Sequence, residues 1–228
     1  MPAATVRALL AALPSVQLYQ FCGQTEAGPG GIYAGPEDVA ARPEASGRYA
    51  MPNTEARVVT AAGADVGPGE VGELVLRGET VMKGYWNRPE ATAETIRDGW
   101  LHTGDLATRD AEGYITLVDR IKDLIITGGR NVYSVEVENA LAGHPDLVDV
   151  AVIGMPHPDY GESILAVVVP ADGARPEIGS LRAWAKERIA DYKAPHALAV
   201  HSIPRNPSGK IQKHLLRAEL DQLVAQME

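Results

Sequence analysis

The chain has 228 residues, of which 45% are hydrophobic, and a formal net charge of −9. This length allows one large domain or two modest ones, and the acidic balance argues against binding to nucleic acid, which requires a basic surface. The single cysteine, Cys22, excludes a disulfide within the chain and a zinc site built from several thiolates. No apolar run is long enough for a transmembrane helix and no convincing signal peptide precedes the first motif, so the sequence predicts a cytoplasmic protein.

The first 54 residues predict one helix and little further regular structure. The helix is indicated by apolar side chains at helical spacing, which stop at Pro14: Val6, Leu9, Leu10 and Leu13. Residues 16–19 are a candidate strand. Residues 22–54 are rich in Gly, Pro, Ala and Ser and are predicted to form loops.

From residue 45 to residue 118 the pattern is that of β-structure. Short β-rich runs at residues 56–60, 74–77 and 114–118 are separated by turns that contain glycine. A small antiparallel barrel or sheet is the expected fold of this region. Residues 72–86 are interpreted as structural, because their glycines suit turns and their aromatic side chains suit packing.

After residue 123 the pattern predicts a compact α+β unit of about 100 residues. Strands are expected at residues 124–126, 148–153, 164–169 and 197–203. Two helices are expected to start at N-cap residues Ser134 and Ser180. The second of these has an apolar stripe: Leu181, Trp184, Ala185 and Ile189. A last helix is predicted to turn four residues inward: Leu216, Leu220, Leu223 and Val224.

Residues 180–217 hold eight basic side chains and two acidic ones. The basic ones are Arg182, Lys186, Arg188, Lys193, Arg205, Lys210, Lys213 and Arg217. Such a zone suits phosphate-rich small molecules such as ATP or coenzyme A. For most of these residues, a solvated helix face is the favoured interpretation.

Short motifs follow one another along the chain. They are Phe21-Cys22-Gly23-Gln24-Thr25-Glu26, Gly72-Glu73-Leu74, Gly84-Tyr85-Trp86, Leu101-His102-Thr103-Gly104-Asp105, Asp119-Arg120-Ile121-Lys122-Asp123, Thr127-Gly128-Gly129-Arg130-Asn131 and Pro207-Ser208-Gly209-Lys210. None is specific alone. In this order they resemble the second half of the adenylate-forming (AMP-binding) superfamily, and the acyl-CoA synthetases in particular.

The resemblance implies a mixed α/β and α+β fold in two parts. Residues 1–118 would be a remnant of the AMP-binding large domain, with a small antiparallel β-barrel over residues 45–118. Residues 119–123 would be a hinge, and residues 124–228 a compact α+β C-terminal cap domain.

The first motif has the chemistry of a phosphate site. A Thr hydroxyl can donate to a phosphate oxygen, and a carboxylate can hold Mg²⁺, which prefers oxygen ligands. The resemblance implies that Thr25 contacts the α-phosphate, that Glu26 binds Mg²⁺, and that Gly23 and Gln24 belong to the nucleotide loop. The family usually has a Tyr, which packs on adenine, where this chain has Cys22, so Phe21 or another group would have to cover the base. Without the other motifs, a Thr-Glu loop is an ordinary polar turn.

The middle motifs are implied to bind the ribose and to form the pivot. Asp105 and Arg120 match family residues that reach the ribose hydroxyls, and a carboxylate can accept two hydrogen bonds from a diol. Lys122 matches the pivot about which the cap rotates. Without the resemblance, Thr103-Gly104-Asp105 would be a turn that closes a hairpin, and residues 119–123 a charged linker.

The last two motifs are implied to serve the two steps of the reaction. The loop with Gly128, Gly129 and Arg130 would line the tunnel for the pantetheine of coenzyme A, and Lys210 would be the adenylation lysine. An ammonium group can neutralise charge that develops on a phosphate. Read without the resemblance, Gly128-Gly129 is a strand-to-helix turn and Lys210 a surface side chain.

The implied function is an ATP- and Mg²⁺-dependent acid–CoA ligase that acts on a small carboxylic acid, and the resemblance favours a fatty or medium-chain acid. A Ser/Thr/Gly-rich phosphate loop with a Lys is not found, so we expect a C-terminal portion whose missing N-terminal half, with the acyl pocket, is supplied elsewhere. One alternative is a non-catalytic remnant that binds nucleotide or coenzyme A weakly, or docks to a protein. Another is an enzyme that loads a carrier protein.

Overall fold

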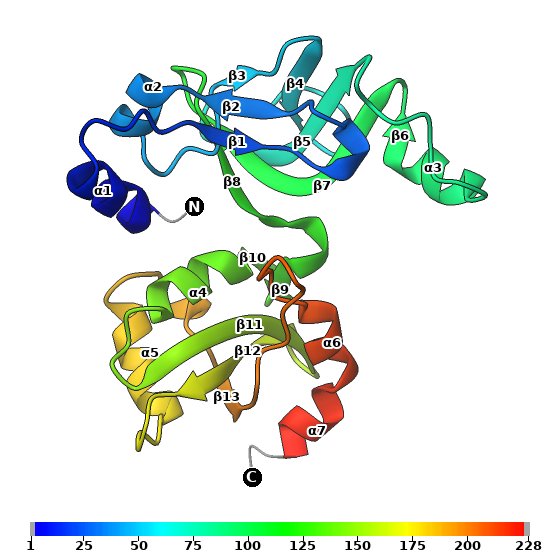
Figure 1. Ribbon diagram of the computed structural model, residues 1–228. Helices are drawn as coiled ribbons and strands as arrows, with labels where there is room; N and C mark the ends of the chain where they lie inside the picture. Colours follow the sequence, from blue (N-terminus) through cyan, green and yellow to red (C-terminus); the bar gives the residue numbers. More distant parts are fainter. Residues whose placement is uncertain (1–2, 226–228) are drawn as a thin grey trace. The chain divides into compact units, whose positions relative to one another are not determined.

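The computed structural model describes residues 3–225, which fold into two compact units that divide between Ile121 and Lys122 (Figure 1). Among the described residues, no helix has the length and apolar character needed to cross a lipid bilayer.

The N-terminal unit begins with a small three-stranded sheet flanked by helices. Its elements are α1 (Ala3–Ala12), β1 (Gln20–Cys22), η1 (Thr25–Ala27), β2 (Ile32–Ala34), α2 (Pro36–Ala41) and β3 (Tyr49–Ala50). The strands are antiparallel in the order β1-β2-β3. The prediction of a strand at residues 16–19 is wrong, because the strand begins at Gln20. The prediction of loops over residues 22–54 misses η1, β2, α2 and β3. The two strands are only three and two residues long, and they are strands only because they pair with neighbouring strands.

A curled antiparallel sheet forms the rest of this unit. Its elements are β4 (Thr54–Val59), β5 (Val71–Gly78), α3 (Pro89–Thr95), β6 (Ile96–Arg97), β7 (Trp100–Arg109) and β8 (Ile115–Arg120). The order is β4-β5-β7-β6, and β8 also pairs with β7. No ladder joins β4 to β8 within residues 3–225, so the sheet is half of a barrel rather than a closed one. Its buried cluster includes Leu76, Leu101 and Ile115.

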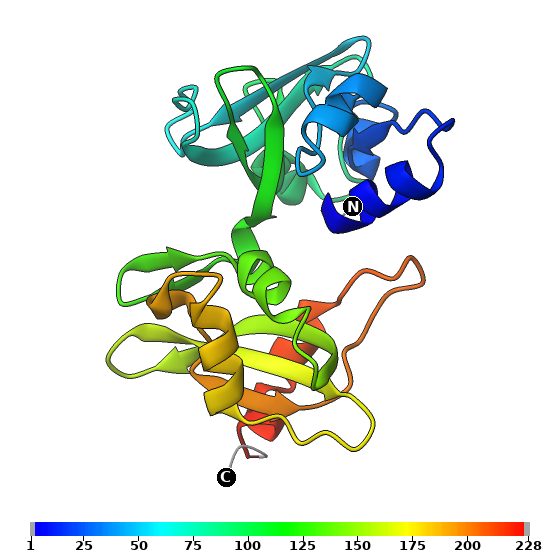
Figure 2. The same cartoon turned by 90° about the vertical axis from the view of Figure 1, so that its left-hand side faces the viewer.

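The C-terminal unit is a sheet covered by helices on both faces. Its elements are η2 (Ile121–Asp123), β9 (Ile125–Thr127), β10 (Arg130–Val132), α4 (Ser134–Leu141), β11 (Leu147–His157), β12 (Gly161–Pro170), α5 (Ile178–Lys186), η3 (Asp191–Lys193), β13 (Ala197–Val200), α6 (Lys213–Ala218) and α7 (Leu220–Ala225). The sheet order is β10-β9-β12-β11, and β13 runs parallel to β12. Helices α4 and α5 cover one face, and α6 and α7 the other (Figures 1 and 2).

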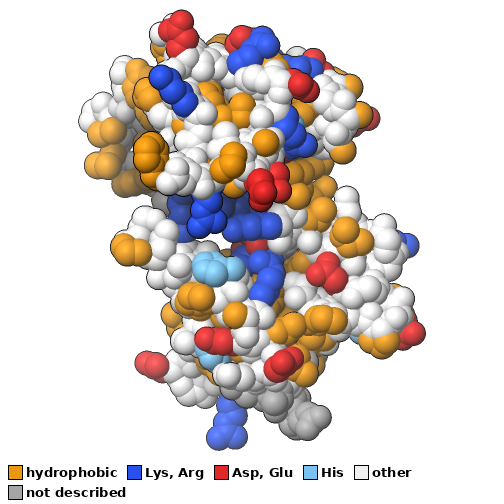
Figure 3. Space-filling model, turned by 90° about the vertical axis from the view of Figure 1, so that its right-hand side faces the viewer, with side chains coloured by type: hydrophobic (Ala, Val, Ile, Leu, Met, Phe, Trp, Pro, Cys, Tyr) orange, Lys and Arg blue, Asp and Glu red, His pale blue; other side chains and the backbone are white. Residues whose placement is uncertain are grey.

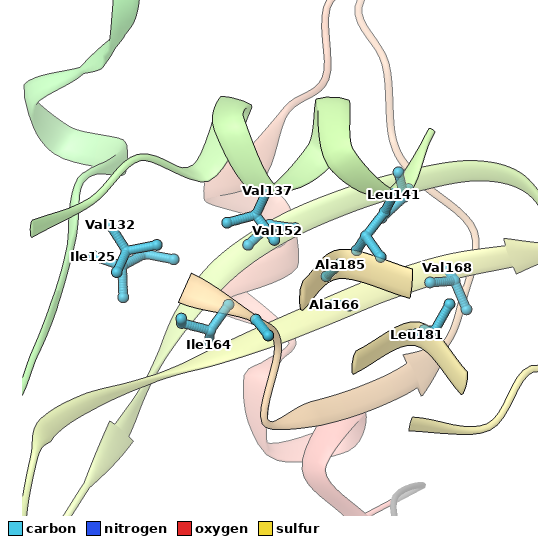
Figure 4. Close-up of a cluster of buried hydrophobic side chains, with 12 residues drawn as sticks. Ile125, Val132, Val137, Leu141, Val152, Ile164, Ala166, Val168, Leu181 and Ala185 are labelled. Carbon is cyan, nitrogen blue, oxygen red and sulfur yellow. The ribbon is translucent and has the colours of Figure 1, made fainter. Parts of the chain in front are cut away.

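Alternation along β11 explains this three-layer arrangement. Val150 and Val152 pack toward α4 and α5, whereas Ala151 and Ile153 pack toward α6 and α7, because successive side chains of a strand point to opposite faces. Figure 4 shows how side chains from β9, β10, α4, β11, β12 and α5 converge in the first of these cores. The predicted stripe of α5 packs here, with Leu181 fully buried.

Three local predictions for this unit are wrong. The N-cap residues are Tyr133 and Glu177, not Ser134 and Ser180, and neither makes a side-chain cap. The Ser134 hydroxyl instead accepts from Lys213 Nζ, and Ser180 Oγ lies 3.1 Å from His144 Nε2, so both hydroxyls serve partners distant in the sequence. The last helix is two short helices, and Val224 is 42% exposed rather than inward.

Candidate functional site

The loop of Gly23, Gln24, Thr25 and Glu26 follows β1 and forms one 3-10 turn. A Cβ atom at Gly23 would lie 2.6 Å from the carbonyl oxygen of Gly30. Only glycine therefore fits at this position of the loop. Thr25 is exposed. Glu26, the middle residue of this turn, is half-buried.

The Glu26 carboxylate is held by a segment to which the sequence assigned no chemistry. The Tyr85 hydroxyl donates to Glu26 Oε1 at 2.8 Å, and the Met82 backbone N–H donates to the Glu26 carbonyl at 2.8 Å. The hydrogen bond to the Glu26 carboxylate raises the pKa of Tyr85, which keeps the phenol protonated as a donor. Tyr85 is therefore a positioning residue for Glu26, and its motif, Gly84-Tyr85-Trp86, was the only signal of it.

The donor set at this loop fits Mg²⁺ that is shared with a phosphate ligand, not a metal enclosed by protein. Within residues 3–225, no group of three or more His, Cys, Asp and Glu side chains could hold a metal ion. Mg²⁺ commonly takes one or two carboxylates and completes its octahedron with water and phosphate oxygens. The Glu26 carboxylate, with the Thr25 hydroxyl beside it in the chain, is such a partial set.

Phe21 cannot take the place of the family's tyrosine at Cys22. The two residues are neighbours on β1, so their side chains point to opposite faces of the sheet. Cys22 packs against the buried cluster of the curled sheet, whereas Phe21 is 63% exposed and stacks between Tyr19 and Tyr33. The expectation that Phe21 covers an adenine at the Cys22 position is therefore wrong.

Asp105 and Arg120 lie together within the N-terminal unit. They are paired positions on β7 and β8, and Arg120 Nε lies 3.1 Å from Asp105 Oδ1. Thr103-Gly104-Asp105 is inside β7, so the alternative of a turn that closes a hairpin is wrong. The Asp105 side chain is only 18% exposed, which fixes the orientation of its carboxylate.

Glu73 on β5 holds the backbone before Asp105. The ladder between β5 and β7 shifts register between Glu73 and Val75. Across this irregularity, Glu73 Oε1 accepts from the Gly104 backbone N–H at 3.0 Å, and Glu73 Oε2 lies 2.7 Å from His102 Nδ1. Sequence reasoning gave Glu73 no chemistry, although the Gly72-Glu73-Leu74 motif marked it.

Side-chain interactions hold the chain on each side of the boundary between the units. Arg120 is bound by Asp105 of the N-terminal unit, and Asp123 accepts from Arg217 of the C-terminal unit at 2.8 Å. Ile121 and Lys122 lie between these two anchors, and both are exposed.

Gly128 and Gly129 form a two-residue hairpin turn. Thr127 and Arg130 pair across it, and the two glycines have φ of +55° and +74°. Such turns match the twist of the flanking strands and require positive φ, which explains the glycines. The alternative of a strand-to-helix turn is therefore wrong. The Arg130 guanidinium lies 4.9 Å from the centre of the Tyr192 ring.

Lys210 stands on an ordered turn built around Asn206. The Asn206 side-chain oxygen accepts three hydrogen bonds: from the Ser208 N–H, the Ser208 hydroxyl and the Lys210 N–H, at 3.1, 2.8 and 2.9 Å. Arg205 donates to the Gly209 carbonyl at 2.7 Å and also forms an ion pair with Asp149. The backbone of Lys210 is thus fixed from both sides, and its side chain is exposed.

Charge pairing separates Lys210 from its basic neighbours. Seven of the eight basic side chains between residues 180 and 217 form ion pairs with acidic residues: Arg182, Lys186, Arg188, Lys193, Arg205, Lys213 and Arg217. Lys210 forms none within residues 3–225. The interpretation of a solvated helix face fails for Lys213, which is buried, and for Lys193, Arg205 and Arg217, which pair with residues of other elements. On the face shown in Figure 3, some basic side chains lie next to one another, and others lie beside acidic or hydrophobic ones.

Comparison with known proteins accounts for both units. Residues 1–86 match the family described as AMP-binding enzyme, and residues 136–210 match the AMP-binding enzyme C-terminal domain. The chain belongs to the AMP-binding enzyme family. This confirms the resemblance to adenylate-forming enzymes and the mixed α/β fold.

The AMP-binding relatives are considerably longer than this chain. A feruloyl-CoA synthase of Amycolatopsis sp. is 49% identical over 198 residues, which are 86% of this chain and 40% of that protein. An indoleacetate–CoA ligase of Aromatoleum aromaticum is 40% identical over 93% of this chain and 40% of that protein. A long-chain-fatty-acid–CoA ligase of Escherichia coli O157:H7 is 42% identical over 74% of this chain and 30% of that protein.

Solved structures agree with this assignment. The O-succinylbenzoate coenzyme A synthetase MenE from Bacillus subtilis, in complex with ATP and magnesium ion, has a TM-score of 0.83 and 32% identity, over 95% of this chain and 44% of that chain. This AMP-binding chain therefore spans less than half the length of the proteins that it matches.

Proposed function

We propose that this chain is the C-terminal portion of an acid–CoA ligase. In the proposed reaction, a carboxylate attacks the α-phosphate of ATP and releases pyrophosphate, and the thiol of coenzyme A then displaces AMP from the acyl-adenylate. The observation that carries the proposal is the ordered turn that presents Lys210, a cation without an ion pair among residues 3–225, in a chain of the AMP-binding family. CoA-ligase relatives at 40–49% identity support it.

The chain's own residues would bind and orient the nucleotide. Thr25 would donate to the α-phosphate, Asp105 and Arg120 would bind the ribose hydroxyls, and Lys210 would neutralise charge that develops on the phosphate. Gly23 and Gln24 would shape the phosphate loop. Mg²⁺ bound at Glu26 would supply positive charge to the phosphate oxygens.

The domain assignment and the hinge are parts of this proposal. Residues 1–118 would be a portion of the AMP-binding domain and residues 124–228 the cap domain, with the pivot at Lys122. The anchoring of Arg120 and Asp123 in different units supports a pivot between them, because torsion changes would fall on the two residues that neither anchor holds. The Gly128-Gly129 hairpin with Arg130 would face coenzyme A in the second step.

The substrate class is proposed only as a small carboxylic acid. The fatty or medium-chain acid suggested by the sequence has the support of one fatty-acid–CoA ligase at 42% identity, whereas the relative at 49% identity is a feruloyl-CoA synthase. Both classes belong in the test panel. A cytoplasmic location is part of the same proposal, since ATP and coenzyme A are the cosubstrates.

Pyrophosphate exchange tests the ligase proposal. The chain is assayed alone and with the part of the Amycolatopsis feruloyl-CoA synthase that precedes the matched segment, using ferulate, indoleacetate and a medium-chain fatty acid. Exchange should need both pieces, and Lys210→Ala should lower its rate by about 10²–10³-fold. Lys186→Ala is the matched control, because Lys186 is a lysine of the same unit whose charge is paired with Asp191 at 2.8 Å.

Two outcomes would overturn the proposal. Exchange that survives Lys210→Ala would remove the role given to that lysine. Calorimetric binding of ATP–Mg²⁺ or coenzyme A without any turnover in the reconstituted pair would favour the alternative of a non-catalytic binding module.

A further inference from the structure

The Lys210 turn, residues 206–210, lies in the loop that projects between β13 and α6 (Figure 2). Arg205 and Ile211 face each other at its base as an isolated β-bridge. Among the residues that the structure describes, every hydrogen bond of the turn is internal except one, which the Gly209 carbonyl accepts from Arg205. Arg205 thus supplies the hydrogen bond that connects this turn to the rest of the chain.

The Arg205 guanidinium bridges the turn and the sheet. Its Nη1 donates to the Gly209 carbonyl at 2.7 Å, and its Nη2 donates to Asp149 Oδ1 and Oδ2 at 2.9 and 2.8 Å. Asp149 lies on β11, so one planar group joins that strand to the residue before Lys210. A lysine could not reproduce this bridge, because its single ammonium group lacks the separated nitrogens of a guanidinium.

A β-bulge precedes Asp149 on β11. Leu147 pairs with Pro170 and Asp149 with Val169, so Val148 is the extra residue of this bulge, and it is 71% exposed. Leu147 packs against the core beneath α4 and α5. Bulges are frequent next to functional sites, where they change the direction of a side chain.

The Asp149 carboxylate lies on the face of the sheet on which the Lys210 turn is anchored. The next residues of β11 with the same orientation, Ala151 and Ile153, pack into the core beneath α6 and α7, because side chains alternate along a strand. Ile203 and Ile211, on either side of the turn, pack against this same core. An acidic residue at the end of an apolar row thus stands where the guanidinium reaches it.

We propose that Asp149 is a positioning residue for Lys210. Through Arg205 it holds the outer end of the turn, and with it the start of the lysine side chain, in one place on the C-terminal unit. This inference deepens the proposed function and rests on it. An exposed ion pair contributes little to the free energy of unfolding, whereas a misplacement of about 1 Å can slow a reaction roughly 10²-fold. The pair therefore acts on the rate of adenylation and not on stability.

Two conservative substitutions break the bridge. Asp149→Asn keeps an oxygen for the Val150 N–H, from which Asp149 Oδ1 accepts at 3.0 Å, but removes the charge that holds Arg205. Arg205→Lys keeps the charge but loses one of the two contacts. Asp191→Asn is the matched control, because Asp191 is an acid of the same unit whose ion pair with Lys186, at 2.8 Å, joins η3 to α5 and not to the turn.

NMR relaxation of the full chain measures the anchoring. Both variants should lower the order parameters of the amides at residues 208–210 from about 0.85, the value of a rigid backbone, to about 0.6 or below. The melting temperature should change little, because the Asp149–Arg205 pair is exposed. The control should leave the order parameters of these amides as they are. Order parameters that stay high in Asp149→Asn would overturn the inference.

The rates of the two half-reactions give a second measurement. The chain is paired with the upstream part of the Amycolatopsis feruloyl-CoA synthase. Pyrophosphate exchange with ferulate then reports adenylation, and the conversion of feruloyl-adenylate by coenzyme A reports the second step. Asp149→Asn should lower the kcat of exchange about tenfold and leave the KM for ATP and the second step unchanged, because the role proposed for Lys210 is in adenylation. The double variant with Arg205→Lys should be no slower, since the two residues act as one unit.

Failure of this inference differs from failure of the proposed function. Exchange that Lys210→Ala abolishes but Asp149→Asn leaves unchanged keeps the ligase and rejects the positioning role. Equal losses in both half-reactions also reject that role, because they indicate general damage to the fold. A pair without exchange, whose turn nevertheless loosens in Asp149→Asn, rejects the ligase and keeps the anchoring of the turn by Asp149.

Discussion

Replacing Lys213 by Ala is predicted to lower the free energy of unfolding of the C-terminal unit by about 3–5 kcal/mol, the usual cost of removing one partner of a buried ion pair. Lys213 is 7% exposed, its Nζ lies 2.7 Å from Glu138 Oε1, and it donates to Ser134 Oγ at 2.6 Å. Glu138 Oε1 also accepts from the Val152 N–H, so the substitution leaves a carboxylate without its cation at the junction of α4, α6 and β11. The loss of charge compensation, not of surface area, sets this magnitude.

Urea denaturation followed by far-UV circular dichroism measures the change, and amide hydrogen exchange in β11 and β12 assigns it to this unit. Lys210→Ala, three residues away, is the matched control and should change stability by no more than about 0.5 kcal/mol, because that side chain is exposed. The double variant Lys213→Met with Glu138→Gln should recover part of the loss, since it removes both charges together. A loss below about 1 kcal/mol for Lys213→Ala, or no recovery in the double variant, would refute the reasoning.

Three other outcomes are expected. A hydrogen bond from Arg48 holds the pKa of Asp38 below its ordinary value of 3.8. The Asp38 carboxylate therefore stabilises the N-terminal unit fully above pH 3.8, and this stabilisation is lost as the pH falls through the lowered pKa. Asp38→Asn should therefore reduce the fall of the melting temperature at acid pH, and an unchanged fall would contradict this. Glu73→Ala should speed hydrogen exchange of the Gly104 amide roughly fivefold, the equivalent of one net hydrogen bond, while the Glu55→Ala control should not. Limited proteolysis should cut within residues 13–19, which have no helix or strand and include exposed apolar side chains, before it cuts in the C-terminal unit; equal resistance of both regions would count against an uncovered N-terminal surface.

Predictions succeeded where a local pattern is enough to decide the structure. The apolar stripe of α5 and the long apolar runs of β11 and β12 were evident, because burial on a covered face leaves a periodic pattern. The continuation of β7 through Thr103-Gly104-Asp105 was not predicted, although the strand is ten residues long. These residues remain in a strand only because β5 and β8 pair with β7 on either side, and because Glu73 accepts a hydrogen bond from the Gly104 N–H where the register between β5 and β7 shifts.

The candidate site shows the same division. From the motifs, Asp105 and Arg120 were predicted to bind the same ribose, and the structure pairs the two residues across β7 and β8. Nothing local indicated that Tyr85 donates to Glu26, because that contact joins residues 59 positions apart. The N-cap roles of Ser134 and Ser180 were misjudged for a related reason: a serine hydroxyl suits an N-cap, but partners distant in the sequence bind both hydroxyls here.

The sequence by itself determined the family, the order of the elements that bear the motifs, and the positions that must be glycine, since these depend on residue identity and short spacing. Only the tertiary structure decided which charges are neutralised and which faces are covered. Lys210 and Lys213 are the same residue type three positions apart, yet one is exposed and the other is buried against Glu138. Phe21 and Cys22 are adjacent, yet they lie on opposite faces of one sheet. Those differences arise from contacts between segments far apart in the chain, which no local pattern of residues encodes.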